Sequence, residues 1–336
     1  MPDSPVRPDL LNPQSQIPKP DYFSSPVLVT GGAGFIGSYL VDALINQGAR
    51  VTVVDNLLTG RRENINPQAY FREMDIRDRQ NVLALFHEIS PQYVFHLAAQ
   101  SSVKVSVENP YLDTEINILG GVNILDGARK HGTERVIFSS TGGALYGEVP
   151  EGQLADESWP VKPTSPYAAS KAAFEHILSV YEKSYGLKST VFRFANVYGP
   201  RQDPHGEAGV VAIFAARLLN HQPVTLYAMK TPGDGGCIRD YVFVQDVVES
   251  TLLAPALAQG AYNVATGVAT STCQILAAVA GQLSVRAKVV HAAVRPGDLE
   301  RSVLSGQRLA NLQWRPQVAL QEGLALTAAW FAHNST

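Results

Sequence analysis

Cysteine is scarce in this chain of 336 residues, which contains only Cys237 and Cys273. Two cysteines far apart in sequence supply neither a disulfide framework nor a zinc site, and they are compatible with a reducing cytoplasm. Neither sign of charge predominates, since the chain has 27 lysines and arginines and 30 aspartates and glutamates, which gives a net charge of -3. We therefore expect a cytoplasmic protein that binds no nucleic acid.

Long apolar runs are absent as well. No stretch approaches 18 apolar residues, and the N-terminus lacks the basic and then apolar pattern of a signal peptide. We therefore expect neither a membrane span nor a leader. Residues 1–24 instead hold six prolines, which is typical of a flexible, partly extended tail. The remaining length is enough for about two domains.

A glycine-rich turn is the most informative stretch that is present. Residues 27–40, VLVTGGAGFIGSYL, predict a buried strand, a turn and the start of a helix. Gly31 permits the tight turn, Gly34 lets backbone approach a pyrophosphate, and Gly37 lets the helix pack closely on the strand. The free N–H groups and dipole of the helix N-terminus favour an anion there.

An acidic residue then follows at the spacing that a dinucleotide site requires. The apolar run 51–54 ends in Asp55, 18 residues after Gly37, close to the roughly 20 at which a carboxylate accepts the ribose hydroxyls. An aspartate repels a 2′-phosphate and therefore favours NAD over NADP, whereas the nearby Arg61 and Arg62 favour the phosphate. We expect NAD as the cofactor.

Strands and helices alternate along the rest of the chain, which predicts an α/β fold with right-handed parallel crossovers. We expect a Rossmann-type doubly wound parallel sheet in residues 25–195. Residues 196–336 are expected to form mainly a second, smaller α/β substrate domain, with some segments returning to the first. The expected strands and helices of the first domain are strands 27–29, 51–54, 69–75, 93–97, 135–139 and 188–194, and helices 35–47, 78–88, 110–131 and 166–186.

Three side chains could carry acid and base chemistry. Tyr167 and Lys171 lie four residues apart on a predicted helix and therefore share a face. A phenol needs its pKa of about 10 lowered by roughly 3 units, or about 4 kcal/mol, to act as a base at neutral pH, and an ammonium and a positive nicotinamide could contribute this. Taken alone, the spacing also fits a surface pair. Thr141, which follows a predicted strand in the same crevice, favours the catalytic interpretation.

A series of motifs in one order resembles the extended short-chain dehydrogenase/reductase family, and within it most closely the UDP-glucose 4-epimerases and related nucleotide-sugar 4-epimerases. The resemblance runs from about residue 26 to residue 315. Its motifs are TGGAGFIG, VVDNLLTGRREN, MDIRD, FHLAAQSSV, FSSTGGALYGE, SPYAASK, RFANVYGPRQ, CIRDYVFVQDVV and RPGD. The family implies a catalytic set of Thr141, Tyr167 and Lys171. The segment between the hydroxyls and Tyr146 is one residue longer than the commoner form, so Ser140 stays an alternative to Thr141.

The resemblance also implies which residues bind the two ligands. The expected NAD-binding residues are Gly31, Gly34, Phe35, Ile36, Gly37, Asp55, Asn56, Leu57, Thr59, Gly60, Asp75, Ile76, Leu97, Ala98, Ala99, Asn117, Ser139, Tyr167 and Lys171. The expected UDP-sugar-binding residues are Lys104, Thr141, Asn196, Tyr227, Arg239, Arg295, Asp298 and Ser302. No metal site is expected, because the histidines show no ligand spacing.

The implied reaction is 4-epimerisation of a UDP-hexose through a 4-keto intermediate. Another nucleotide-sugar epimerase, acting on UDP-N-acetylglucosamine or UDP-glucuronate, a dehydratase and a non-catalytic NAD-binding regulator are the alternatives. Gly142 and Gly143 stand where dehydratases of the family carry acidic groups, which argues against elimination. Ser302, four residues after Asp298, is small and predicts that N-acetylated sugars also fit. Family members often pair through helices equivalent to residues 110–131 and 167–186, so we expect a homodimer.

Overall fold

The computed structural model describes residues 17–205, 209–295 and 297–334. Most of the predicted tail, residues 1–16, lies outside these. In its described part, residues 17–24, the side chains of Ile17 and Tyr22 are buried in the core, whereas that of Phe23 is exposed. The Tyr22 hydroxyl is buried and donates a hydrogen bond to the Leu252 carbonyl at 2.8 Å, and its ring meets that of Tyr93 edge-on with centroids 5.5 Å apart.

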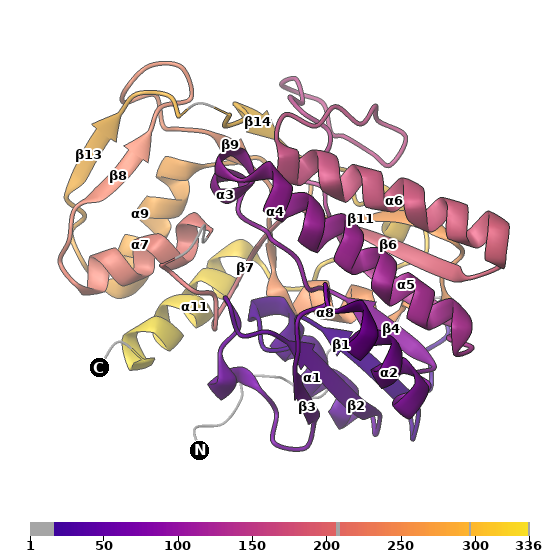
Figure 1. The fold of residues 1–336 in the computed structure, drawn as a ribbon. Coiled ribbons are helices and arrows are strands. Elements are labelled where there is room, and N and C mark those ends of the chain that lie inside the picture. Colours follow the sequence, from indigo (N-terminus) through magenta and orange to yellow (C-terminus); the bar gives the residue numbers. More distant parts are fainter. Residues whose placement is uncertain (1–16, 206–208, 296, 335–336) are drawn as a thin grey trace.

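A seven-stranded sheet organises the larger part of the molecule, in the order β11-β6-β5-β4-β1-β2-β3 (Figure 1). Every pairing in it is parallel. This confirms the predicted doubly wound sheet. Its strands are β1 (Pro26–Thr30), β2 (Arg50–Asp55), β3 (Tyr70–Glu73), β4 (Tyr93–His96), β5 (Arg135–Thr141), β6 (Lys188–Phe194) and β11 (Gly260–Val264).

Both faces of this sheet are covered, as the apolar composition of its strands requires. In β1, Val27 and Val29 contribute to the core shared with α1 and α8, whereas Leu28 contributes to the core shared with α2, α5 and α6. The helices of this unit are α1 (Phe35–Asn46), α2 (Arg79–Ile89), α3 (Val103–Glu108), α4 (Pro110–Thr114), α5 (Gly121–Lys130), α6 (Pro166–Tyr185) and α8 (Val244–Leu252), with short 3-10 turns η1 (Arg62–Asn64) and η3 (Ala254–Ala256).

A smaller α/β unit lies beside the sheet, around β8, β13, α7 and α9 (Figure 1). It contains two short sheets, β13 with β8 and β12-β9-β14, while β10 pairs with β7. Its elements are β7 (Asn196–Tyr198), α7 (Val210–Leu219), β8 (Val224–Tyr227), β9 (Ile238–Arg239), β10 (Tyr241–Phe243), β12 (Thr270–Ser271), α9 (Thr272–Leu283), β13 (Val289–Ala292), β14 (Arg301–Ser302), α10 (Gln307–Ala310) and α11 (Leu320–Asn334).

Among the differences from the elements expected from the sequence, three bear on the sheet and the helices that cover it. The predicted helix 110–131 is divided by a π-helical segment, η2 (Glu115–Gly120), between α4 and α5. Strand β5 runs two residues further than expected and ends at Thr141. Strand β11, which we did not predict, returns from the second half of the chain to pair with β6. Membership of a sheet edge depends on partners distant in sequence, which local patterns do not report.

Candidate active site

Close backbone contacts require glycine at two positions in the turn between β1 and α1. Gly31 has φ +74°, and a Cβ on it would lie 2.6 Å from the Ala98 nitrogen. A Cβ on Gly37 would lie 2.1 Å from the Gly31 carbonyl oxygen, so the close crossing of helix and turn needs glycine. No side chain caps the N-terminus of α1, where Gly34 is the N-cap. The helix therefore offers backbone N–H groups to an anion.

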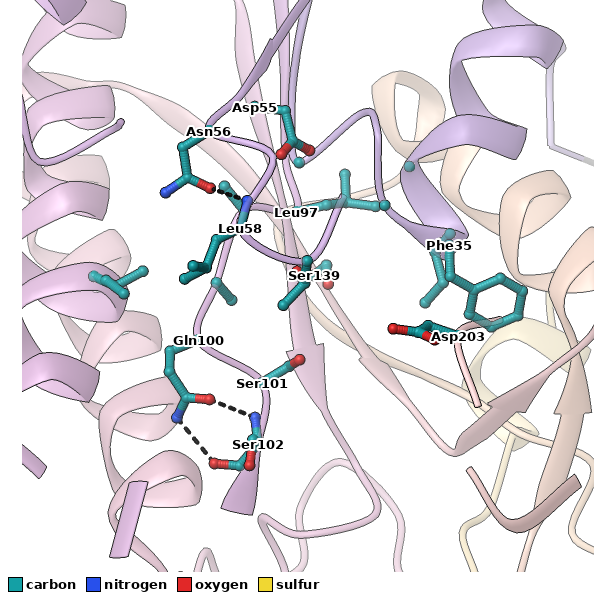
Figure 2. A pocket seen from close by; sticks show the side chains of 18 of the residues that line it. Phe35, Asp55, Asn56, Leu58, Leu97, Gln100, Ser101, Ser102, Ser139 and Asp203 are labelled. Carbon is teal, nitrogen blue, oxygen red and sulfur yellow. Dashed lines mark hydrogen bonds between the residues drawn. The ribbon is translucent and has the colours of Figure 1, made fainter. Parts of the chain in front are cut away.

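Asp55 stands at the end of β2 beside this turn (Figure 2). Its carboxylate accepts hydrogen bonds from the backbone N–H groups of Ala33 at 3.0 Å and Leu57 at 2.9 Å. Burial raises the pKa of Asp55, and these two bonds oppose the rise. Each oxygen keeps acceptor capacity, so the carboxylate can also receive ribose hydroxyls.

The next part of the cleft is built by the ends of β2 and β3. The Asn56 amide donates to the Asp75 carboxylate at 3.1 Å. Hydrogen bonds from Arg77 are the main reason that the pKa of Asp75 falls to about 2. Ile76 is 4% exposed and lines the cleft beside Asp75. An apolar wall with an ionised acid at its edge suits a flat heterocycle that has polar groups on its rim.

Asn117 supports the cleft from behind. Its side chain accepts the Gln100 N–H at 2.9 Å and donates to the Gln100 carbonyl at 3.0 Å and to Ser170 Oγ at 3.0 Å. The Gln100 amide also donates to Asp113 at 2.8 Å. These bonds fix the loop after β4, in which Gln100 and Ser102 hydrogen-bond with each other (Figure 2).

Thr141, Tyr167 and Lys171 come together at the far end of the cleft. The Thr141 hydroxyl lies close enough to the Tyr167 hydroxyl to lower the pKa of the phenol. The Lys171 ammonium donates to the Ser139 carbonyl at 2.9 Å and lies 4.7 Å from the centre of the Phe138 ring. Helix α6 carries both Tyr167 and Lys171. It begins at Pro166, and the Ser165 side chain caps its N-terminus.

Burial dominates the electrostatics of this group. It raises the pKa of Tyr167 to about 12, although the bond from Thr141 opposes the rise. It lowers the pKa of Lys171 to about 8, against the charges of Asp113 and Glu175. The phenol is therefore neutral in the protein alone, and the activation expected from Lys171 by spacing is not among the causes that lower its pKa. A further positive charge is needed to form the phenolate.

Ser140 and Thr141 have different partners. The Ser140 hydroxyl donates to the Glu175 carboxylate at 2.5 Å, whereas the Thr141 hydroxyl lies close enough to Tyr167 to lower its pKa. Both residues lie at the end of β5, but the Ser140 hydroxyl is engaged by Glu175. The geometry therefore favours Thr141 as the hydroxyl that accompanies Tyr167.

One cleft of about 810 Å³ contains most of the residues expected to bind the cofactor. It runs from the Asp55 end to the Tyr167 end along the carboxyl edge of the sheet, where ligands of doubly wound folds bind. The expected residues that line it are Gly31, Gly34, Phe35, Ile36, Gly37, Asp55, Asn56, Thr59, Asp75, Ile76, Leu97, Ala98, Ala99, Lys104, Ser139, Thr141, Tyr167 and Lys171.

Three expected cofactor residues are not among those that line the cleft. Leu57 contributes the N–H that holds Asp55. Gly60 packs on the same carboxylate, because a Cβ there would lie 2.7 Å from Asp55 Oδ1. Asn117 is 3% exposed and holds the Gln100 loop. Each of these three residues contacts a residue that lines the cleft without lining it itself.

Of the residues expected to hold the UDP-sugar, Lys104 and Thr141 line that cleft. Outside its lining, in the smaller unit, lie Tyr227, Arg239, Arg295, Asp298 and Ser302. Ser302 of β14 pairs with Arg239 of β9, and the Arg239 guanidinium donates to the Leu299 carbonyl at 2.7 Å. The Arg295 guanidinium makes two hydrogen bonds with Asp298, at 2.9 and 3.0 Å, and lies 5.4 Å from the centre of the Tyr227 ring.

Asn196 lies between the two groups. It begins β7, and a Cβ on Gly143 would be 3.0 Å from its side-chain oxygen. This places Asn196 beside the turn that follows Thr141. The catalytic end of the cleft and the smaller unit therefore meet at this residue.

One wall of the cleft, formed by Arg61 and by the loop after β7, was not predicted from the sequence. Arg201, Gln202, Asp203 and His205 line it. Arg201 has φ +64° and is held by Asp42 at 2.8 Å. Asp203 accepts from Arg61 at 3.0 Å. This last contact joins residues 142 positions apart, and no local pattern signals it.

Neither a metal site nor a membrane-spanning helix is found among the described residues. They contain no group of three or more histidine, cysteine or acidic side chains placed to hold a metal ion. No helix among them is long and apolar enough to cross a membrane. His96, which the sequence placed outside any ligand set, is buried and hydrogen-bonded to Thr30 at 2.8 Å.

Comparison with known proteins agrees with this geometry. Residues 27–265 match the NAD dependent epimerase/dehydratase family. The chain is 57% identical to the UDP-glucose 4-epimerase of Thermus thermophilus in complex with NAD, with a TM-score of 0.90 over 92% of this chain and 99% of that one. It is 44% identical to Thermotoga maritima UDP-glucose 4-epimerase with UDP-glucose, with a TM-score of 0.88 over the same shares. UDP-glucose 4-epimerase of Mycolicibacterium smegmatis is 44% identical over 92% of this chain and 99% of its own length. The chain belongs to the NAD-dependent epimerase/dehydratase family.

Proposed function

We propose that this protein is an isomerase that interconverts UDP-glucose and UDP-galactose by NAD-dependent 4-epimerisation. One observation carries the proposal. Thr141, Tyr167 and Lys171 together line one end of a cleft whose other end presents Asp55 and an uncapped helix N-terminus. An acid and base group therefore faces the reactive end of a dinucleotide site. The relatives described above support the choice of reaction.

The residues of the cleft fit NAD. The free N–H groups of α1 suit a pyrophosphate, and the Asp55 carboxylate suits the ribose hydroxyls. Lys171 and Ser139 lie where the nicotinamide end would be held. NAD, when bound, supplies a hydride acceptor for sugar C4, a hydride donor for the return step and a positive charge near the phenol.

The side chains of the protein then manage the proton. Tyr167, as phenolate, removes the proton from the sugar 4-hydroxyl while C4 is oxidised to a ketone, and it returns the proton when C4 is reduced from the opposite face. Thr141 stabilises the phenolate by the hydrogen bond that lowers the pKa of Tyr167. Lys171, held by the Ser139 carbonyl, adds positive charge when protonated.

We propose that the smaller unit holds the nucleotide. Arg239 and Arg295 would clamp the diphosphate with charge-assisted bonds, which form when each guanidinium redirects donors that now serve Leu299 and Asp298. Tyr227, 42% exposed, offers a face for stacking the base. Asn196, beside the catalytic turn, and Lys104, at the cleft wall, are placed to receive the sugar and the phosphate next to it.

An elimination reaction fits this site less well. A dehydratase needs an acidic side chain just after the catalytic hydroxyl, and Gly142 and Gly143 stand there. A Cβ on Gly142 would lie 2.3 Å from Leu304 Cδ1, so a larger side chain has no space without movement. The intact catalytic group argues equally against a non-catalytic NAD-binding regulator.

The substrate range is proposed to include N-acetylated UDP-hexoses. Ser302 is 2% exposed, and its hydroxyl makes no hydrogen bond with another described group. A small residue at this position leaves volume that a tyrosine ring would fill, and a clash is an effective way for a pocket to reject a larger sugar.

The deciding experiment is incubation of the purified protein with a panel of UDP-sugars and separation of the C4 epimers. We expect interconversion of UDP-glucose and UDP-galactose without added NAD and without net NADH. Stoichiometric NADH would indicate a dehydrogenase instead. Release of a 4-keto-6-deoxy sugar would indicate a dehydratase, and no reaction with any sugar would favour the regulator.

We further propose a homodimer formed through the helices that follow β4 and β5. Large apolar side chains are exposed on these helices, with Tyr111 at 73%, Leu119 at 56% and Val180 at 55%. Grouped apolar side chains on a helical surface favour burial against a second copy. Sedimentation should give twice the chain mass, and Leu119→Glu should give monomers.

We also propose a cytoplasmic location. Cys237 and Cys273 are both free thiols, which a reducing compartment preserves. Fractionation of the source cells with antibodies to the protein would test this. Recovery outside the cytoplasmic fraction would refute it.

A further inference from the structure

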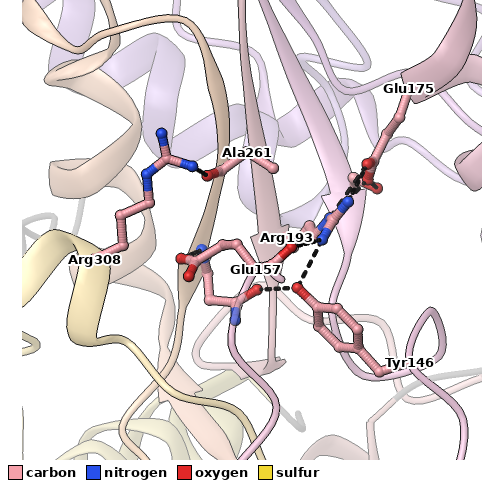
Figure 3. Close-up of polar contacts among 8 residues, drawn as sticks. Tyr146, Glu157, Glu175, Arg193, Ala261 and Arg308 are labelled. Carbon is pink, nitrogen blue, oxygen red and sulfur yellow. Dashed lines mark hydrogen bonds and ion pairs between the residues drawn. The ribbon is translucent and has the colours of Figure 1, made fainter. Parts of the chain in front are cut away.

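A chain of polar side chains lies between α6 and the sheet, and Figure 3 shows its members Tyr146, Glu175 and Arg193. The Glu175 carboxylate accepts three hydrogen bonds from Arg193, the shortest at 2.6 Å, and one from Ser140 at 2.5 Å. Arg193 also donates to the Tyr146 hydroxyl at 2.8 Å. The Tyr146 hydroxyl donates to the Asn263 side chain at 2.7 Å. We call these residues the Glu175 network.

The network is buried and tied to three strands. Ser140 is 4% exposed, Arg193 7%, Tyr146 1% and Asn263 0%. The Asn263 amide donates onward to the carbonyls of Ala155 and Ser305 at 3.0 and 3.1 Å. Burying so many polar groups is costly unless they are all paired, and a fully paired network is rigid. Glu175 is therefore anchored through Arg193 to β6 and beyond it to β11.

The position of Glu175 relative to the active site is the important feature. Tyr167, Lys171 and Glu175 are successive at intervals of four on α6 and so lie along one side of it. They face three consecutive residues of β5. Lys171 donates to the Ser139 carbonyl and Glu175 accepts from Ser140, while the Thr141 hydroxyl lies close enough to Tyr167 to lower the pKa of the phenol. Strand and helix are thus held in register by two hydrogen bonds next to the contact between Thr141 and Tyr167.

We propose that Ser140 and Glu175 are positioning residues for the reaction proposed above, on which this inference rests. Their bond lies next to the bond between Lys171 and the Ser139 carbonyl, and the Arg193 ion pair keeps Glu175 in place. It fixes the end of β5 against α6, so that the Thr141 hydroxyl stays within reach of Tyr167. Because a displacement of about 1 Å can cost roughly 10²-fold in rate, its loss should reduce turnover without changing ligand binding.

The test is Ser140→Ala, which leaves the Glu175–Arg193 pair intact and so preserves the fold. In protein that contains bound NAD, we expect kcat to fall roughly 10- to 100-fold, with KM for UDP-glucose and NAD content unchanged. Glu175→Gln should also lower kcat, and the double variant should lose no more than the worse single one, because both act through one bond.

Ser189→Ala is a matched control. The Ser189 hydroxyl is buried and donates to Glu182 of the same helix at 2.7 Å, again from a strand to α6 but far from Tyr167. This variant should keep native kcat. If it loses as much kcat as Ser140→Ala, or if Ser140→Ala keeps native kcat, the positioning role is refuted.

A titration that does not depend on turnover separates this inference from the proposed function. The ultraviolet difference spectrum of each NAD-loaded variant against its Tyr167→Phe counterpart reports the Tyr167 phenolate. Since the Thr141 bond lowers the pKa of Tyr167, Ser140→Ala should move the midpoint to higher pH. The charged and titratable neighbours, Asp113 on α4, Lys171 and Glu175 on α6 and His96 on β4, are unchanged in that variant. If the native protein converts no UDP-hexose, the proposed function fails and this titration alone decides, with an unmoved midpoint refuting the inference.

Discussion

The two halves of the site are built in different ways. The cofactor half, from Gly31 to Lys171, lies on the carboxyl edge of one parallel sheet, where strand pairing places each loop beside the next. In the sugar half, the strands that carry Asn196, Tyr227, Arg239 and Ser302 are only two to four residues long, and Arg295 and Asp298 lie in a loop. Individual side chains hold it together. Glu148, for example, accepts the N–H groups of Glu300 and Arg301 at 2.6 and 3.0 Å.

Because of this difference, the two halves should respond differently to substitution. Many backbone hydrogen bonds fix the edge of the sheet, so a side chain can be replaced there while its neighbours keep their positions. Segments held by single long-range bonds can shift when one contact changes. Substitutions in the cofactor half should therefore alter chemistry or NAD retention alone, and substitutions in the sugar half should alter selectivity.

The largest effect is expected for Tyr167→Phe. The ring stays in its buried place, so the fold and bound NAD should be retained, while loss of the positioned acid and base should lower kcat by roughly 10² to 10⁴. Steady-state rates with UDP-glucose and NAD released on denaturation would measure both. Near-native turnover would remove Tyr167 from the mechanism, and loss of NAD would contradict the separation of the two halves.

A smaller effect, on selectivity, is expected for Ser302→Tyr. The ring would occupy space next to Arg239, with which Ser302 is paired, and should lower kcat/KM for UDP-N-acetylglucosamine relative to UDP-glucose by roughly 10- to 200-fold. Ser302→Ala, which keeps the volume small, should retain the native ratio, and thermal melting would detect a variant that is merely misfolded. The proposal fails if the native protein ignores acetylated sugars or if the folded tyrosine variant processes both alike.

The same difference explains what could be predicted from the sequence. Glycine spacing and Asp55 predicted the cofactor half because these residues act within one strand, turn and helix. Ser140 and Thr141 could not be distinguished, since their partners depend on the register between β5 and α6. The support that Asn117 gives to Gln100 requires knowledge of packing. The sugar half was named by resemblance alone, as no local pattern brings Arg239 next to Ser302.

Asp55→Asn should have an effect comparable in size to that of Ser302→Tyr, but on the retention of NAD alone. Loss of a charge-assisted bond, worth about 1.5–3 kcal/mol, should speed NAD release by roughly 10- to 100-fold. Burial raises the pKa of Asp55 in the folded protein. The native protein should therefore lose its hold on NAD as the pH falls, at a higher pH than an ordinary aspartate would give, because protonation removes the charge. Asp55→Asn should lack this dependence, and gel filtration at several pH values would show it. Unaltered NAD content would contradict the assignment.

The smallest effect is expected for Arg61→Gln, which removes a contact between the loops after β2 and β7. Arg61, after β2, pairs with Asp203, after β7, at 3.0 Å, and their side chains are 44% and 38% exposed. Arg61→Gln would release this contact and leave the Asp203 carboxylate without its positively charged partner in the lining of the cleft, and both changes should weaken NAD retention. Exposed pairs contribute at most about 1 kcal/mol, so release should speed up by no more than roughly fivefold. High salt should abolish the difference, since it screens such charges. Arg62→Gln is the matched control, because Arg62 pairs with Glu73 on its own side of the cleft and is not among the residues that line it. A larger loss that persists in high salt would show that Arg61 binds the cofactor directly and does not act by joining the two loops.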